Sequence, residues 1–395
     1  MIEKLVVLTF STFNKRDYQR YGIDILKSNN FSVEVWDITP VVYPRRVSEY
    51  IPHDALDRFN CPELLVLENK KDFFDKLANL GREACFICLL KLDAETLFIF
   101  KELSRKGLKY LLSNCNIPPP VTSWTQSHIP ESKENRGVFL QWKKRLNNIH
   151  SRIMGILLYR FPVNLFSFAP PLYLLVGGTK SDYKSAFFRR SERIWAHSYD
   201  FDRYLELEHA EDSLPLKNWA VFLDHGTPYQ PDVLSYGKER IPPEKYYPIL
   251  LAFFDRIEKD TGLEVVIAAH PRWDYQKAPD HFKGRKILRG QTVRLVKESK
   301  LVIGIFSTAL TFAAVYRKPV FFLRTGVHLP EIVQSVATAF GKRVHCHPNE
   351  EIDWEEEFSV NNAVYSRYLD SYIKKQGTPN LPLWQIVADR LKQEI

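Results

Sequence analysis

A complete strand–helix–strand unit near residue 300 is the feature that most constrains how this chain folds. Leu301 to Ile305 is a short apolar run, Ala309 to Tyr316 is alanine-rich, and Val320 to Leu323 is apolar again. Short apolar runs on both sides of a helix are typical of parallel strands that helices cover on both faces. The unit therefore predicts an α/β domain, whose ligands bind beyond the carboxyl ends of its strands.

The length of the chain predicts more than one such domain. A chain of 395 residues is too long for a single core. We expect Rossmann-like domains over residues 1–210 and 218–380, an acidic linker between them, and a closing helix over 381–395. In the first half, predicted strands (Leu5–Phe10, Ser32–Asp37, Ala84–Leu90, Leu108–Leu112) alternate with predicted helices (Asp17–Ser28, Lys71–Leu80, Ala94–Lys106).

The first predicted strand is not followed by a glycine-rich dinucleotide motif. The loop after Phe10 reads Ser-Thr-Phe-Asn-Lys-Arg, without the Gly-x-Gly-x-x-Gly pattern. This argues against a dinucleotide cofactor in the first domain. It favours a role on the acceptor side of a transfer reaction.

A histidine, a proline and an arginine follow the apolar run 264–269. His270 stands where a buried parallel strand should end, Pro271 stops the strand, and Arg272 adds a permanent cation. At the carboxyl end of a parallel strand, these residues indicate an anion site, most simply one for phosphate. The alternative is a histidine that closes a strand and whose ring is satisfied by the backbone.

Two hydroxyl residues stand one unit further along the chain. Ser307 and Thr308 follow the strand that contains Gly304 and precede the alanine-rich helix. Hydroxyls at such a position cap free N–H groups, and the same N–H groups attract anions. Capping alone would explain one of the two. Because His270 and Ser307 follow strands of one predicted sheet, the pair favours a nucleotide donor.

These motifs resemble the donor half of GT-B glycosyltransferases. The pattern strand-His-Pro, then strand-Ser-Ser/Thr-helix ending in Lys-Pro-Val, is similar to that of bacterial sialyltransferases, polysialyltransferases and Kdo transferases, over roughly residues 219–325. The resemblance implies two Rossmann-like domains facing a central cleft. It also implies that His270-Pro271 and Ser307-Thr308 contact the CMP part of a CMP-sugar.

The same families take their general base from an acidic motif. Its nearest match is Asp224-His225-Gly226, which has one carboxylate where the families have two. Asp224 is our first choice because it also ends a predicted strand, Trp219 to Leu223. Asp200 and Asp202 are the alternatives, either as the base or as helix-capping residues.

The predicted reaction is a metal-independent glycosyl transfer without a cofactor. A nonulosonic acid or Kdo-type sugar would move from a CMP donor to a surface polysaccharide or lipopolysaccharide, a glycan or glycolipid acceptor. Fixed donors on the leaving phosphate would replace a metal, since the sequence has no Asp-x-Asp where a cation would be expected. The alternatives are a transferase of another nucleotide-activated group, of UDP-sugar or CDP-glycerol type, and a noncatalytic nucleotide-binding protein.

The charge of the chain adds a membrane expectation. Its 55 basic and 47 acidic residues give a net charge of +8, which suits phosphorylated substrates or an anionic membrane. The basic residues are scattered without a nucleic-acid-binding signature, so nucleic acid is not an expected partner. A basic amphipathic helix is predicted over about 138–160, either lying on an anionic membrane or packed on its own domain.

The cysteines and the amino terminus suggest the compartment. Five cysteines show no framework spacing, and Cys85 and Cys88 lie in an apolar strand that aims them at opposite faces. They are predicted core thiols of a reducing compartment. Met1 leads directly into a strand without a signal peptide, so we expect a cytoplasmic protein, with the inner face of the membrane as the alternative. His345, Cys346 and His347 are predicted to lie in a structural strand, since no third metal ligand is apparent.

Overall fold

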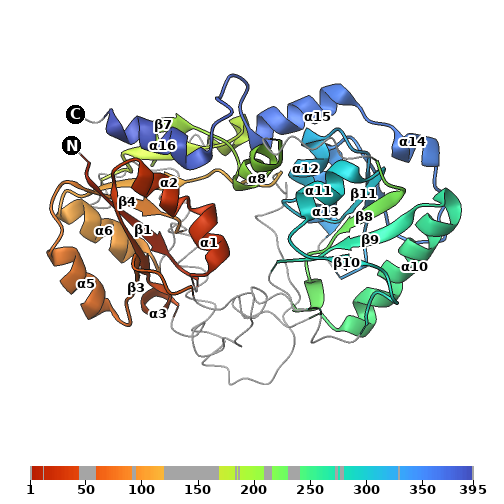
Figure 1. The fold of residues 1–395 in the computed structure, drawn as a ribbon, viewed down its shortest axis with the longest axis horizontal. Helices are drawn as coiled ribbons and strands as arrows, with labels where there is room; N and C mark the ends of the chain where they lie inside the picture. Colours follow the sequence, from red (N-terminus) through yellow and green to blue (C-terminus); the bar gives the residue numbers. More distant parts are fainter. Residues whose placement is uncertain are drawn as a thin grey trace.

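Two parallel β-sheets form the cores of two domains that lie side by side (Figure 1). The computed structural model describes residues 2–11, 13–43, 59–90, 95–119, 169–182, 185, 187–208, 216–229, 241–271, 275, 280–327 and 330–393. The predicted helix over 138–160 and Arg272 fall outside these described residues.

The first domain is built on a seven-stranded sheet in the order β3-β2-β1-β4-β5-β6-β7. Every neighbouring pair is parallel. The strands are β1 (Lys4–Thr9), β2 (Ser32–Asp37), β3 (Leu64–Val66), β4 (Ala84–Cys88), β5 (Lys109–Ser113), β6 (Tyr173–Val176) and β7 (Glu192–Trp195). The helices are α1 (Lys15–Arg20), α2 (Ile23–Ser28), α3 (Thr39–Val42), α5 (Lys70–Ala78) and α6 (Leu97–Arg105), with the 3-10 turn η4 (Thr179–Ser181) after β6.

Helices cover both faces of this sheet, as the continuous apolar strands predict. Phe73 of α5 and Phe100 of α6 pack on the face that carries Cys88. Leu26 of α2 packs on the opposite face, which carries Cys85. The two thiols therefore point to opposite faces, as strand alternation predicted, and both are free and buried.

The second domain has a six-stranded parallel sheet in the order β10-β9-β8-β11-β12-β13. Its strands are β8 (Trp219–Leu223), β9 (Glu264–Ala268), β10 (Ile287–Leu288), β11 (Leu301–Gly304), β12 (Val320–Leu323) and β13 (Val344–His345). Its helices are α10 (Pro243–Thr261), α11 (Thr292–Glu298), α12 (Leu310–Val315), α13 (Pro330–Ala339), α14 (Trp354–Phe358) and α15 (Asn362–Tyr368), with the 3-10 turn η5 (Thr227–Tyr229) after β8 and a π-helical turn η7 (Leu369–Ile373) after α15.

Both sheets contain the doubly wound order of a Rossmann fold. In each, the first strand lies between the second and the fourth, and the chain reverses its direction of growth at that point. The predicted fold class, two Rossmann-like domains with parallel sheets, is confirmed.

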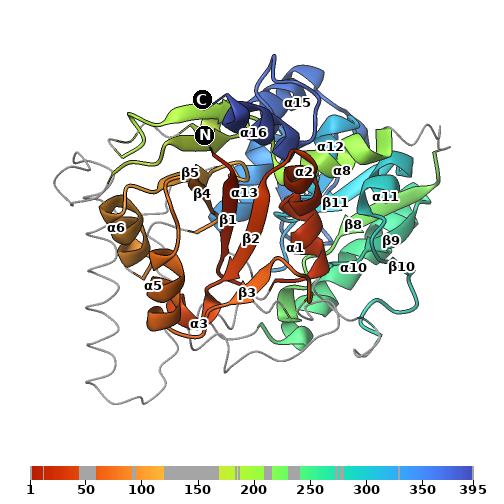
Figure 2. The ribbon, with the colours of Figure 1, turned by 60° about the vertical axis from the view of Figure 1, so that its left-hand side comes forward.

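Two helices connect the domains. Each follows one domain in the sequence but packs against the core of the other. Helix α8 (Tyr199–Glu208) follows the first sheet, yet its Phe201 and Leu205 lie in the core of the second domain. Helix α16 (Leu383–Lys392) ends the chain, yet its Trp384 and Leu391 lie in the core of the first. Figure 2 shows α16 above the first sheet, near α2.

The single helix predicted over Asp17–Ser28 is in fact two, α1 and α2. Gly22 separates them with a backbone φ of 57°, a left-handed conformation that interrupts a helix. A Cβ atom on Gly22 would lie 2.4 Å from Cδ1 of Trp384. The break therefore makes room for the indole of α16, a contact that the local sequence does not reveal.

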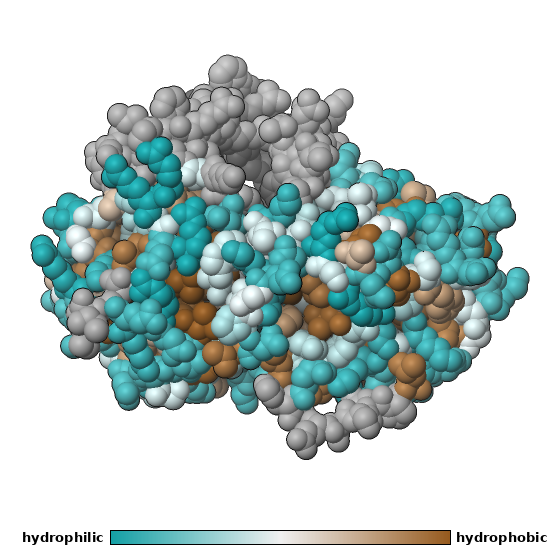
Figure 3. Space-filling view, turned by 90° about the horizontal axis from the view of Figure 1, so that it is seen from above, coloured by the Kyte–Doolittle hydropathy of each residue, from teal (hydrophilic) through white to brown (hydrophobic). Residues whose placement is uncertain are grey.

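The face of the molecule seen in Figure 3 is mainly polar. On the face seen in Figure 3, hydrophobic residues form small separate areas between hydrophilic ones. Scattered exposed apolar residues of this kind are ordinary for a globular protein. No helix in the described parts of the chain is both long enough and apolar enough to cross a bilayer.

Candidate functional site

The switch point of the second sheet lies between β8 and β11. Open α/β sheets bind ligands outside the carboxyl ends of the strands at such a point. The loop after β8 begins with Asp224 and the loop after β11 contains Ser307, while His270 follows β9 on the other side of β8. The predicted base and both predicted phosphate motifs thus follow three adjacent parallel strands.

Both carboxylate oxygens of Asp224 accept hydrogen bonds at this edge of the second sheet. Its side chain Oδ1 accepts a hydrogen bond from the Gly226 amide at 3.0 Å, and its Oδ2 accepts one from the Tyr275 hydroxyl at 2.5 Å. Gly226 adopts a φ of 58°, which folds the loop back onto the carboxylate. The residue is 5% exposed, and this burial raises the pKa of its carboxyl, against the opposing effect of the hydrogen bonds.

His225 joins the loop after β8 to the loop after β11. Its Nε2 accepts a hydrogen bond from the Phe306 amide at 3.4 Å, and its ring stacks on the Phe306 ring with centroids 4.5 Å apart. An amide can only donate, so the hydrogen of the neutral ring is on Nδ1, which lies 3.2 Å from the Thr227 hydroxyl. The buried imidazole therefore fixes the spacing of the two loops at the switch point.

His270 lies two residues beyond β9 and is half-buried. Its amide donates to the Tyr275 hydroxyl at 2.7 Å, so that its main chain is connected to Asp224 through one phenol. Pro271 is exposed beside it. The structure thus places His270-Pro271 next to the Asp224 loop.

Gly304 is the last residue of β11, and a side chain there would press on the end of the Leu310 side chain. A Cβ atom there would lie 2.8 Å from Cδ2 of Leu310, the first residue of α12. Glycine therefore lets the helix return closely over the strand end.

Ser307 and Thr308 precede α12, but neither is its N-cap residue. The predicted helix begins at Ala309, but α12 begins at Leu310, and Ala309 is its N-cap without a side-chain hydrogen bond. The Ser307 hydroxyl accepts from the Ala309 amide at 3.3 Å. Thr308 is exposed, and within the described residues its hydroxyl has no hydrogen-bond partner. One hydroxyl thus orders the turn, and the other is accessible to a ligand.

Asp200 and Asp202 belong to a separate region, the first turn of α8. Oδ1 of Asp202 accepts from the Leu383 amide at 2.9 Å and lies 3.6 Å from Nε2 of the buried His197. Asp202 thus anchors the first turn of α16. Burial raises the pKa of Asp202, while the nearby His197 opposes this effect.

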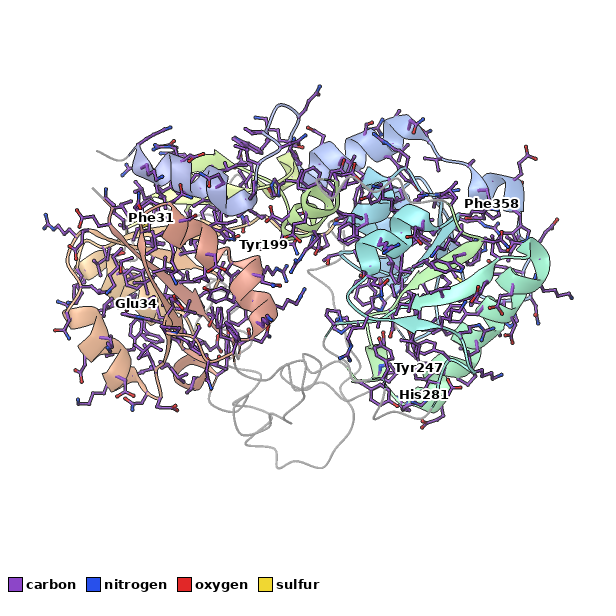
Figure 4. All side chains as sticks on the ribbon, in the orientation of Figure 1. Phe31, Glu34, Tyr199, Tyr247, His281 and Phe358 are labelled. Atoms are coloured by element: carbon purple, nitrogen blue, oxygen red, sulfur yellow. The ribbon has the colours of Figure 1, made fainter. Side chains whose placement is uncertain are left out.

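Asp200 lies near Arg20 of α1. Burial alone would lower the pKa of Arg20, but the charge of Asp200 and neighbouring groups raises it. The Arg20 guanidinium lies 4.7 Å from the centre of the Tyr199 ring, which is labelled in Figure 4 between the two domains. Oδ2 of Asp200 is buried and has no hydrogen-bond partner among the described residues. None of the described contacts joins Asp200 or Asp202 to Asp224.

The histidine-rich segment near residue 345 has a structural explanation. His345 is fully buried in β13, with Nδ1 at 2.5 Å from Glu350 and Nε2 at 2.9 Å from Glu357. His347 lies two residues on and is exposed. In the parts of the chain that the structure describes, no three histidine, cysteine or acidic side chains gather as a metal site.

Tyr275 is the site residue that the sequence did not reveal. Its partner Asp224 is 51 residues upstream, so no local pattern connects them. Tyr247 of α10 also lies near Asp224, whose charge adds to the effect of burial in raising the pKa of Tyr247. Tyr247 stacks on His281 with ring centroids 4.2 Å apart, and Figure 4 labels both below the second sheet. Tyr247 and Tyr275 thus both lie near the carboxylate.

Comparisons with known proteins show only distant likenesses. No protein-family model matches the chain, and no curated protein matches it in sequence. Among solved structures, the UDP-GlcNAc 2-epimerases of Neisseria meningitidis (12% identity, TM-score 0.49) and Methanocaldococcus jannaschii (11%, 0.47) are similar over 100% of both chains. The wall teichoic acid polymerase TagF (10%, 0.47) is similar over 99% of this chain and 88% of its own. By its own sheet topology, the chain has the GT-B architecture of two Rossmann-like domains.

Proposed function

We propose that the protein is a metal-independent glycosyltransferase that uses a nucleotide-activated sugar and no cofactor. The observation that carries the proposal is the meeting of three loops at the switch point of the second sheet, with Asp224, His270 and Ser307 at adjacent strand ends. Within this class we propose a CMP-linked nonulosonic acid or Kdo-type sugar as donor. The proposed acceptor is a surface polysaccharide or lipopolysaccharide.

The leaving group of such a donor is a phosphate, and the second domain supplies groups to bind it. As the bond between the anomeric carbon and the phosphate oxygen breaks, negative charge grows on the phosphate. The His270 ring, the accessible Thr308 hydroxyl and Arg272 are the proposed donors. A single well-placed donor to a developing oxyanion contributes roughly 3 kcal/mol.

Asp224 is the proposed general base. The acceptor oxygen attacks the anomeric carbon while its hydrogen passes to the Asp224 carboxylate. Burial raises the pKa of Asp224, which makes the carboxylate a stronger base than one in water. The acceptor would enter from the first domain across the predicted cleft. Contact with an anionic membrane through residues 138–160 remains a prediction.

A nucleotide panel in a thermal-shift assay tests the donor site. A nucleotide at about 100 times its Kd stabilises the folded state by about 2.7 kcal/mol. We expect CMP to raise the melting temperature and the Ser307→Ala/Thr308→Ala double variant to lose this response. A selective response to UDP would replace the donor assignment. No response to CMP, CDP or UDP would contradict the proposal.

The Asp224→Asn variant tests the base. With CMP-N-acetylneuraminic acid as donor, transfer of the sugar to an oligosaccharide acceptor, followed as CMP release, should fall by about a hundredfold, within the usual range for a positioned base. The CMP-induced thermal shift should survive, because the phosphate groups are unchanged. Asp255→Asn is the matched control, since this aspartate lies on α10 with 60% of its side chain exposed. Full turnover by Asp224→Asn would remove Asp224 from the mechanism.

A further inference from the structure

Tyr275 occupies a position between the proposed base and the His270 loop. Its hydroxyl oxygen accepts a hydrogen from the His270 amide at 2.7 Å. An amide nitrogen can only donate, so the single hydrogen of the phenol is available for its other partner. That partner is Oδ2 of Asp224 at 2.5 Å. The direction of both hydrogen bonds is thus determined, and Tyr275 donates to the carboxylate.

We infer that Tyr275 is a positioning residue, which holds Asp224 ionised and fixes its distance from the His270 loop. The inference rests on the proposed function only for the role of Asp224 as base. Through one phenol, the carboxylate after β8 is connected to the main chain after β9. A shift of the His270 loop would therefore move the proposed base. Tyr275 thus fixes the position of Asp224 relative to the His270 loop.

The surroundings of Asp224 make this hydrogen bond important. In the described parts of the chain, the titratable side chains near Asp224 on other elements are Tyr246 and Tyr247 of α10 and Tyr275, and His225 is its neighbour on the same loop. No lysine or arginine in the described parts of the chain forms an ion pair with Asp224. Among the described residues, the ionised carboxylate is therefore stabilised by hydrogen bonds from Tyr275 and the loop amides.

Loss of the phenol hydroxyl has a defined electrostatic consequence. Burial raises the pKa of Asp224, and the bond from Tyr275 is the strongest of the opposing effects. In Tyr275→Phe the burial remains and this opposition is lost, so the pKa of Asp224 rises further. A hydrogen bond to a charged group corresponds to a rise of about one to two pH units. The ring itself still packs near Phe282, so the fold is expected to persist.

The first test measures Asp224 without any substrate. Infrared difference spectra over a pH series record the carboxylic acid band that is present in the wild type and absent in Asp224→Asn. We expect the midpoint of that band to move upward by about one to two pH units in Tyr275→Phe. Tyr247→Phe is the matched control, because its hydroxyl is near Asp224 without a hydrogen bond to it, and its midpoint should not move. An unchanged midpoint in Tyr275→Phe would overturn the inference.

The second test measures turnover of CMP-N-acetylneuraminic acid over the same pH range. The acid limb of kcat/KM should move upward with the band midpoint in Tyr275→Phe, whereas a purely structural role would lower turnover equally at every pH. A midpoint that moves while the acid limb stays would refute the positioning role in catalysis. If no nucleotide-sugar is turned over by the wild type, the proposed function fails, and the infrared midpoint alone decides whether Tyr275 holds Asp224 ionised.

Discussion

Replacement of Trp384 by alanine should destabilise the first domain, although this residue lies near the end of the chain. The Trp384 side chain is 1% exposed, and its Nε1 donates to the Arg20 carbonyl at 2.9 Å. Removal of a buried tryptophan leaves a cavity and costs about 3–5 kcal/mol, and the lost hydrogen bond is included in that range. The Trp384→Phe variant keeps a ring in the cavity and should lose clearly less.

Urea denaturation and hydrogen exchange together test this expectation. The unfolding free energy of Trp384→Ala should fall by about 3–5 kcal/mol. Amides of β1 should lose protection before those of β8, because α16 packs on the first sheet. Leu216→Ala, at a residue 62% exposed, is the control and should change stability by less than about 0.5 kcal/mol. A loss below about 1 kcal/mol, or earlier exchange in β8, would refute the packing argument.

Three further predictions concern the site and its supports. His270→Ala and Ser307→Ala/Thr308→Ala should each lower turnover at least about tenfold, or roughly 1.4 kcal/mol of barrier, in steady-state kinetics. Asp202→Ala should lower the unfolding free energy by about 1 kcal/mol, as for a lost helix cap, and should leave kcat unchanged. A folded but inactive variant would make Asp202 the base. A general base must be ionised, and burial raises the pKa of Asp224. The acid limb of the wild-type pH profile should therefore lie above the ordinary aspartate pKa of about 4. An acid limb below that value would exclude Asp224 as the base.

The sequence predicted the elements of the fold better than their contacts. Strands such as β1 and β11 are short continuous apolar runs, and that pattern is local, so both were found within a residue or two. β3 lies in the equally apolar run Leu64 to Leu67 but was not predicted as a strand, and its three residues are only half-buried. The packing of α8 and α16 on the opposite domains depends on which surfaces meet after folding, which periodicity does not record.

In the candidate site, too, the positions of the residues could be predicted from the sequence but their contacts could not. Asp224, His270 and Ser307 each follow a predicted strand, so the sequence could place them at one sheet edge. The contacts that connect them were not predictable, because the Tyr275–Asp224 bond spans 51 residues and the Phe306–His225 bond spans 81. The hydroxyl of Ser307 shows that helix-start signals locate a turn well and its individual hydrogen bonds poorly.

The packing of α8 and α16 on opposite domains limits how this protein could be divided or recombined. A fragment that ended near residue 210 would expose Phe201 and Leu205 to water and would lack the helix that carries Trp384. A fragment that began near residue 218 would carry α16 without the surface it covers. Neither half is a self-contained module, so a chimaera that exchanges donor specificity with another such protein must transplant α8 with the second domain and keep α16 with the first.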